Sequence, residues 1–116
     1  MRPVRDPLFI ELGMGADLRG ADATKAARRA VRNAIDRNLL PGIYGLLKGG
    51  GRMAVHARLA VPAGTGPVDI EAVRAEFPAG DVTIEVVQGG MVTPNGLADG
   101  GNALIVNAAV EVGIVR

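Results

Sequence analysis

The chain has 116 residues, of which 48% are hydrophobic and 22% charged, and its formal net charge is +1. These values favour one compact domain over a disordered chain, and the near balance of charge excludes the one-sided positive field of a typical nucleic-acid binder. Serine and cysteine are absent and His56 is the only histidine. Neither a Ser-His nor a Cys-His pair can therefore form, and any nucleophile must be a threonine, a lysine, a carboxylate or bound water.

A first strand is predicted over Leu8–Met14, where the side chains alternate with the period of a half-buried strand. Phe9, Glu11 and Gly13 fall on one side of it, and the larger aliphatic residues fall on the other. We expect the aliphatic side to face the core.

A helix is predicted over Ala23–Asn38, with Asp22 capping it by accepting from the free amides of the first turn. One stripe of this helix consists of small and branched apolar residues, which allows close approach to a sheet. The opposite side is basic and lacks the aromatic residues that stack on bases, so a solvated helix face is favoured over a nucleic-acid surface. Its basic residues are Lys25, Arg28, Arg29 and Arg32.

The second half of the chain predicts three more strands and a short helix. These elements are the strand Arg52–Val61, the helix Ile70–Glu76 capped by Asp69, the strand Val82–Val87 and, after a glycine-rich excursion over 89–101, the strand Ala103–Val115.

Together the elements predict an α/β (α+β) fold, a single domain over 1–116 with one sheet of about four strands and two helices packed on one face. The other face should mix apolar and charged residues, as faces that meet another subunit do. The residues expected there are Phe9, Glu11, His56, Arg58, Glu85, Ile105, Asn107 and Glu111, of which His56, Arg58, Glu85, Asn107 and Glu111 are the candidate interface residues.

Three glutamates on that expected face, Glu11, Glu85 and Glu111, allow two interpretations. They can be paired carboxylates for acid-base chemistry, or they can form interface salt bridges with Arg58 or Arg52, which is the favoured interpretation. A hydrogen-bonded core or interface role is favoured for the histidine, because one histidine among scattered carboxylates has no zinc-type spacing. We expect no metal and no cofactor.

The chain has no run of 18 apolar residues, and its first ten residues carry Arg2, Arg5 and Asp6. We therefore expect neither a membrane span nor a secretory signal, no membrane or nucleic-acid partner, and a cytoplasmic location. The absence of cysteine agrees with a reducing compartment.

Four strings carry a resemblance that covers nearly the whole chain: FIELGMG, DATKAARRAV, VVQGGM and VNAAVEVG. In this order and spacing they resemble an uncharacterised bacterial and fungal family of short conserved hypothetical proteins of the Lin type. The resemblance bears on family membership and does not imply an activity.

The same pattern is similar to one repeat of the Toblerone-fold ring-opening cyclic amide hydrolases, cyanuric acid hydrolase and barbiturase. Those enzymes carry three repeats around a pseudo-threefold axis, each like the trimeric proteins of the chorismate mutase and reactive-intermediate deaminase type. The resemblance implies that a single repeat forms a homotrimer.

In the hydrolases each repeat supplies a lysine, an arginine and a serine. At the matching places this chain has Met14, Lys25 and Gln88, and neither methionine nor glutamine can replace a serine–lysine pair. The resemblance therefore implies the architecture without the hydrolase chemistry. Lys25 can still direct a cation at an anionic or carbonyl oxygen near the helix start. The candidate ligand-binding residues are Lys25, Thr24, Glu11, Gln88, Gly89 and Gly90.

Three functional hypotheses remain open. The favoured one is a non-catalytic homotrimer that binds a small polar or anionic ligand between subunits. The second is a hydrolase or deaminase that uses bound water with Lys25 and a carboxylate from Glu11 or Glu85. The third is a purely structural or regulatory protein.

Overall fold

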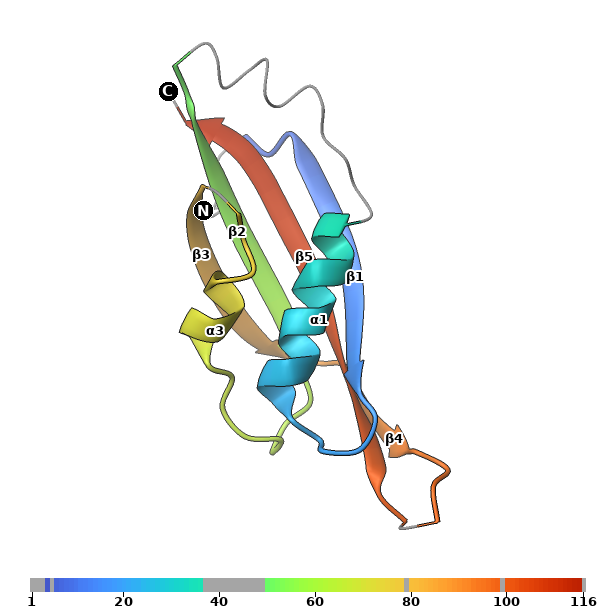
Figure 1. The fold of residues 1–116 in the computed structure, drawn as a ribbon. Helices are drawn as coiled ribbons and strands as arrows, with labels where there is room; N and C mark the ends of the chain where they lie inside the picture. Colours follow the sequence, from blue (N-terminus) through green and yellow to red (C-terminus); the bar gives the residue numbers. More distant parts are fainter. Residues whose placement is uncertain (1–3, 5, 37–49, 79, 99, 116) are drawn as a thin grey trace.

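The computed structural model describes residues 4, 6–36, 50–78, 80–98 and 100–115. Over these residues its mixed α+β architecture consists of one five-stranded sheet with two helices on one face (Figure 1). The elements in chain order are β1 (Phe9–Asp17), α1 (Ala23–Asp36), β2 (Arg52–Val61), α3 (Ile70–Arg74), β3 (Asp81–Gln88), β4 (Met91–Pro94) and β5 (Asn102–Val115).

The long strand β5 organises the sheet, whose main strand order is β1-β5-β2-β3. β1 and β2 flank β5 in antiparallel register, and β3 lies parallel to β2 after the crossover through α3. The first residues of β5 extend beyond β2 and pair with β4, so a hairpin projects at one end of the molecule (Figure 1).

The predicted elements agree with the structure, with bounds that shift by up to three residues. One strand, β4, was not predicted, because it lies within the segment that was predicted to be a glycine-rich excursion. Pro94 and the surrounding glycines are unfavourable for a strand, and β4 forms only through its pairing with β5. The predicted end of the first helix at Asn38 lies outside the described residues.

Close packing of α1 against β1 depends on two glycines. A Cβ built on Gly13 would lie 2.3 Å from the carbonyl oxygen of Ala30, and one built on Gly15 would lie 2.2 Å from that of Ala26. Both contacts are with helix backbone, so no side-chain rotation can relieve them. Glycine at these two places lets the alanine stripe of α1 lie directly on the strand.

The core fills the space between the helices and the sheet. Leu59, Leu104, Val31, Val73, Val106 and Val110 are its largest fully buried side chains. Because α1 contributes mainly alanine, the helix approaches the sheet closely and the core is thin.

The face of β1 that points toward the core is the opposite of the predicted one. Phe9 and Glu11 were expected on the open face, but they share the helix side with Gly13 and Gly15. The reason is steric: since only glycine fits beneath α1, the alternation of the strand turns the larger side chains outward. Leu8, Ile10, Leu12 and Met14 are accordingly 48%, 57%, 65% and 59% exposed.

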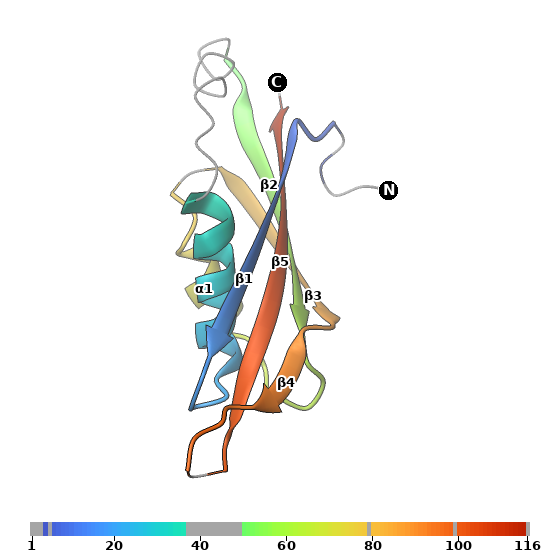
Figure 2. The same ribbon diagram turned by 90° about the vertical axis from the view of Figure 1, so that its right-hand side faces the viewer.

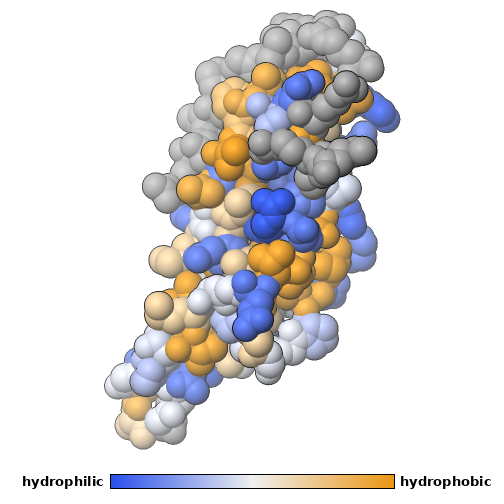
Figure 3. Space-filling model, turned by 180° about the vertical axis from the view of Figure 1, so that it is seen from behind, coloured by the Kyte–Doolittle hydropathy of each residue, from blue (hydrophilic) through white to orange (hydrophobic). Residues whose placement is uncertain are grey.

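The open face of the sheet carries no helix among the described residues (Figure 2). Figure 3 views the molecule from this side and shows apolar side chains next to polar ones. At one end of this face Val4 lies over Gly113 of β5. The molecule measures 55 × 27 × 19 Å, and its radius of gyration of 15.4 Å exceeds the roughly 13 Å of a compact domain of this length.

Among the described helices, none has the length and apolar character needed to cross a lipid bilayer.

Candidate functional site

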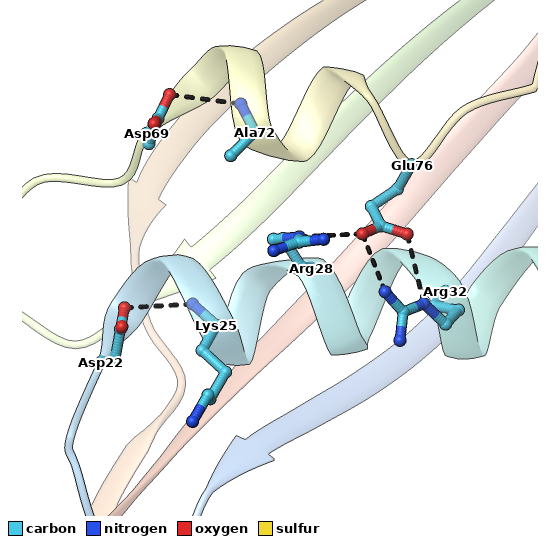
Figure 4. A network of polar contacts seen from close by, with 7 residues as sticks. All are labelled: Asp22, Lys25, Arg28, Arg32, Asp69, Ala72 and Glu76. Carbon is cyan, nitrogen blue, oxygen red and sulfur yellow. Dashed lines mark hydrogen bonds and ion pairs between the residues drawn. The ribbon is translucent and has the colours of Figure 1, made fainter.

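Two of the predicted ligand residues, Thr24 and Lys25, lie at the start of α1. Both take part in hydrogen bonds that hold the local structure. Asp22 Oδ1 accepts from the backbone amide of Lys25 at 3.1 Å, which confirms the predicted cap (Figure 4). Thr24 Oγ1 accepts from the backbone amide of Asp69 at 2.9 Å, so it ties the start of α1 to the cap of α3. The ammonium of Lys25 remains exposed and points away from α3 (Figure 4).

A clamp that the sequence analysis missed holds the turn before α1. Asp17 is 5% exposed, and its Oδ2 accepts from the backbone amide of Asp22 at 2.9 Å. This bond lowers the pKa of Asp17, with further backbone bonds from Gly20 and Arg19 and the attraction of Lys25. The signal in the sequence was an aspartate at the end of a strand, five residues before a capping aspartate.

The basic side of α1 is exposed but largely engaged. Arg28 Nε and Arg32 Nη2 each lie 2.8 Å from Glu76 Oε1 beyond α3 (Figure 4), and Arg29 donates to the backbone oxygen of Ala16 at 2.6 Å. Hydrogen bonding to Arg32, followed by that to Arg28, lowers the pKa of Glu76. An open hollow of about 190 Å³ lies along this side and is lined by Lys25, Arg28, Arg29 and Arg32.

The Gln88-Gly89-Gly90 turn joins β3 to β4, and its glycines allow close contact with β2 and β5. Gly90 has a φ of +68°, and a Cβ on it would lie 2.2 Å from the carbonyl oxygen of Ile105. Gly89 donates its amide to the carbonyl oxygen of Val61 at 3.0 Å. Gln88 is exposed. The turn is therefore pressed against β2 and β5, and only the glutamine side chain is available to a ligand.

Glu11 lies apart from the other candidate ligand residues. It pairs in register with Val110, whereas Gln88 lies three strands away and one residue beyond the level of Asn107. The two residues are therefore separated by about 13 Å along the strands and about 14 Å across them. Glu11 is 5% exposed, and its Oε1 has no hydrogen-bond partner in the described part of the chain. Burial raises its pKa.

Glu11→Gln should stabilise the folded chain at neutral pH by roughly 1 kcal/mol, because the buried charge disappears. A carboxyl pKa raised by folding favours the protonated folded state, so the wild-type penalty is full above the raised pKa and vanishes below the ordinary value of 4.5. Thermal unfolding at several pH values should show a gain for Glu11→Gln that shrinks as pH falls. The exposed Glu71→Gln is the control, and equal curves for both variants would contradict the prediction.

Polar side chains gather on the open face around His56, which is 5% exposed. Its Nδ1 lies 2.7 Å from Thr83 Oγ1 and its Nε2 lies 3.4 Å from Glu85 Oε1. Arg58 Nε donates to the same Glu85 oxygen at 2.6 Å, and this bond, followed by the one from the histidine, lowers the pKa of Glu85. The ion pair predicted between Arg58 and a glutamate of this face is thus formed within one chain.

Two further candidate interface residues share this face. Glu111 is 6% exposed and lies opposite His56 in the β2–β5 register, and Asn107 is exposed at the level of Met14 and Ala60. Thr83 was not among the predicted site residues, because its contact with the histidine depends on the parallel register of β2 and β3.

The structure does not bring together the pairs that the enzyme hypothesis requires within one subunit. Lys25 lies on the helix layer, whereas Glu85 lies on the open face, and Glu11 lies toward the carboxyl end of α1. No group of three or more histidine, aspartate or glutamate side chains arranged to hold a metal occurs in the part of the chain that the structure describes.

Comparison with known proteins gives a family and one related structure. A model of conserved hypothetical proteins, Lin0512_fam, matches residues 7–112, and no curated protein matches the chain. A crystal structure described as an FtsZ-like protein of unknown function, from Nostoc punctiforme PCC 73102, is 37% identical over 99% of both chains with a TM-score of 0.81. This structural relative is not a cyclic amide hydrolase repeat. Because the family model matches most of the chain, residues 7–112, the chain belongs to the Lin0512 family of conserved hypothetical proteins.

Proposed function

We propose that the protein is a self-assembling subunit, three copies of which join through the open face of the sheet, and that each copy binds a small polar or anionic ligand at the exposed basic side of α1. The observation that carries the proposal is the apolar row of β1, formed by Leu8, Ile10, Leu12 and Met14, whose side chains are about half exposed or more. This row extends for about 20 Å along one strand. Contiguous apolar surface of this kind marks interaction sites on soluble proteins.

The neighbouring strands offer a surface of lower relief. Beside the apolar row, β5 and β2 present the small residues Ala109 and Ala60 on the same face, next to their register partners Arg58 and Asn107. The apolar row of one copy can lie against the two alanines of the next. Such a contact uses two different patches, and it closes into a ring when the rotation between copies is right. The proposed number of three copies comes from the resemblance to the Toblerone-fold hydrolases, which carry three repeats around one axis.

The charged groups around the histidine lie beside the apolar row, at the edge of the proposed contact, and do not oppose assembly. Glu85 is already paired with Arg58 and lies near His56 within the same chain, so no isolated charge faces the contact there. An unpaired buried charge would cost several kcal/mol, whereas a paired one leaves the apolar contact to drive association.

The assembly is tested by measuring mass in solution. At micromolar concentration, light scattering or sedimentation should give close to three times the 11.9 kDa of one chain. Leu12→Glu should give monomers, because a carboxylate in the middle of the apolar row would be buried unpaired. Val86→Glu is the matched control: Val86 is 45% exposed but lies on the helix side of β3. A monomeric wild type, or a trimeric Leu12→Glu, would overturn the proposal.

The ligand half of the proposal is supported by Lys25, whose ammonium is exposed beside the other basic residues of α1. Inorganic phosphate should raise the melting temperature of the wild type and leave that of Lys25→Ala unchanged. If the trimer forms and phosphate has no effect, the purely structural hypothesis replaces the ligand-binding one.

A further inference from the structure

The open face contains a hydroxyl, an imidazole and a carboxylate in contact, and none of the functions considered above uses this arrangement. Thr83 and Glu85 lie two residues apart on β3 and point to the same side, and His56 lies opposite Thr83 on β2. The three side chains come from adjacent strands of one subunit, so the sheet itself fixes their relative positions.

The carboxylate determines which ring nitrogen of the histidine carries the proton. Arg58 Nε lies 2.6 Å from Glu85 Oε1 and keeps this carboxylate ionised, and an ionised carboxylate only accepts hydrogen bonds. Hydrogen bonding to Glu85 at 3.4 Å therefore places the single proton of a neutral His56 ring on Nε2. Its Nδ1 is left with a free lone pair.

That lone pair faces the hydroxyl of Thr83. The Oγ1 atom lies 2.7 Å from Nδ1, compared with 3.4 Å from the carbonyl oxygen of Val55, its other acceptor. With the ring proton on Nε2, Nδ1 accepts the hydroxyl proton across this shorter contact. A hydroxyl within hydrogen-bond reach of a base, itself oriented by a third group, is the arrangement that activates an oxygen nucleophile.

A substrate can reach the threonine but not the histidine. His56 is 5% exposed, so its ring is shielded from direct acylation, whereas Thr83 is exposed on the edge strand β3. Arg58 Nε donates to Glu85 and so holds the carboxylate that orients the histidine.

We propose that Thr83 is an acyl acceptor, with His56 as its general base and small activated carboxylic esters as its substrate class. The threonine oxygen attacks the ester carbonyl carbon while its proton passes to Nδ1. The bond from carbon to the leaving oxygen then breaks, and the departing alcohol takes that proton. Water subsequently attacks the acyl-threonine, releasing the carboxylic acid and restoring the hydroxyl. No oxidant, metal or cofactor takes part in either step.

The test uses p-nitrophenyl acetate as the acyl donor and the full chain as the acceptor. Release of p-nitrophenol should accompany the gain of an acetyl group that peptide mapping places on Thr83. His56→Gln should slow this acetylation by roughly 100-fold, the lower range of general-base catalysis. Thr83→Ser should accelerate it, because a primary hydroxyl is less hindered, and Thr83→Val should abolish it.

Controls separate this chemistry from background reactivity and from folding defects. Thr93→Val alters a second strand threonine, which is partly buried on β4, and should leave the rate unchanged. Glu85→Gln keeps the histidine but removes the negative charge that orients it, and should also slow acetylation. Acetylation confined to lysines or the amino terminus, or a rate unaffected by His56→Gln in a folded variant, would overturn the proposal.

This proposal and the assembly proposal can fail separately. All the groups of the relay belong to one subunit, so a monomeric Leu12→Glu should still become acetylated at Thr83. A wild type that is monomeric but acetylated at Thr83 would remove only the proposed function, whereas a trimeric wild type that shows no acetylation would remove only the acyl-acceptor role.

Discussion

Gly15→Ala should prevent stable folding or lower the free energy of unfolding by at least about 3 kcal/mol, the upper end of overpacking effects. The added methyl would lie 2.2 Å from the carbonyl oxygen of Ala26 and 2.3 Å from the backbone nitrogen of Ala30. Both atoms belong to the helix backbone, so α1 would have to move as a whole. Domains of this size have only about 5–15 kcal/mol of stability to lose. Circular dichroism and urea titration measure the loss.

Met14→Ala is the matched control for this change. Met14 is next to Gly15 in the same strand, but its side chain is 59% exposed on the open face. Its removal should alter subunit stability by no more than about 0.5 kcal/mol. A Gly15→Ala protein as stable as Met14→Ala would show that α1 does not lie against β1 as described.

Leu59→Ala should lower the free energy of unfolding by about 2–5 kcal/mol. Leu59 is fully buried in the cluster that joins β2 to α1 and β5, together with Ala27, Val61 and Leu104. Truncation would remove buried apolar surface and leave a cavity beneath the rigid helix backbone. Urea unfolding followed by circular dichroism gives the change directly.

Leu12→Ala provides the comparison that decides which leucine belongs to the core. Leu12 is 65% exposed, so its truncation should cost the isolated subunit no more than about 0.5 kcal/mol. The two variants should be compared at concentrations where the wild type is monomeric, because assembly would add its own contribution. Equal losses for Leu12→Ala and Leu59→Ala would reverse the assignment of the two faces.

The face of β1 illustrates where sequence-based prediction stops. Alternation with period two shows that Leu12 and Met14 share one side and that Gly13 and Gly15 share the other. It does not show which side meets the helix, and the usual preference for burying large apolar residues gave the wrong answer. The available signal was the pair of alternating glycines followed by an alanine-striped helix, a combination that permits close backbone contact.

In the candidate sites too, contacts between residues close in the chain were predicted and contacts between distant residues were not. The capping roles of Asp22 and Asp69 were predicted correctly, because a cap is a contact between residues three apart in the chain. The contact between His56 and Thr83 was not predicted, since these residues are 27 positions apart and meet only through the parallel register of two strands.

The sequence by itself determined every element except β4, together with their order and caps, because hydrophobic periodicity and capping are local properties of the chain. It also excluded serine and cysteine chemistry through the absence of both residues. Only the tertiary structure decided that Glu11 is buried, that Glu85 lies between Arg58 and His56, and that an apolar row remains uncovered. These outcomes depend on strand register and on which side of β1 can accept a helix, and both are fixed by steric contacts between segments distant in sequence.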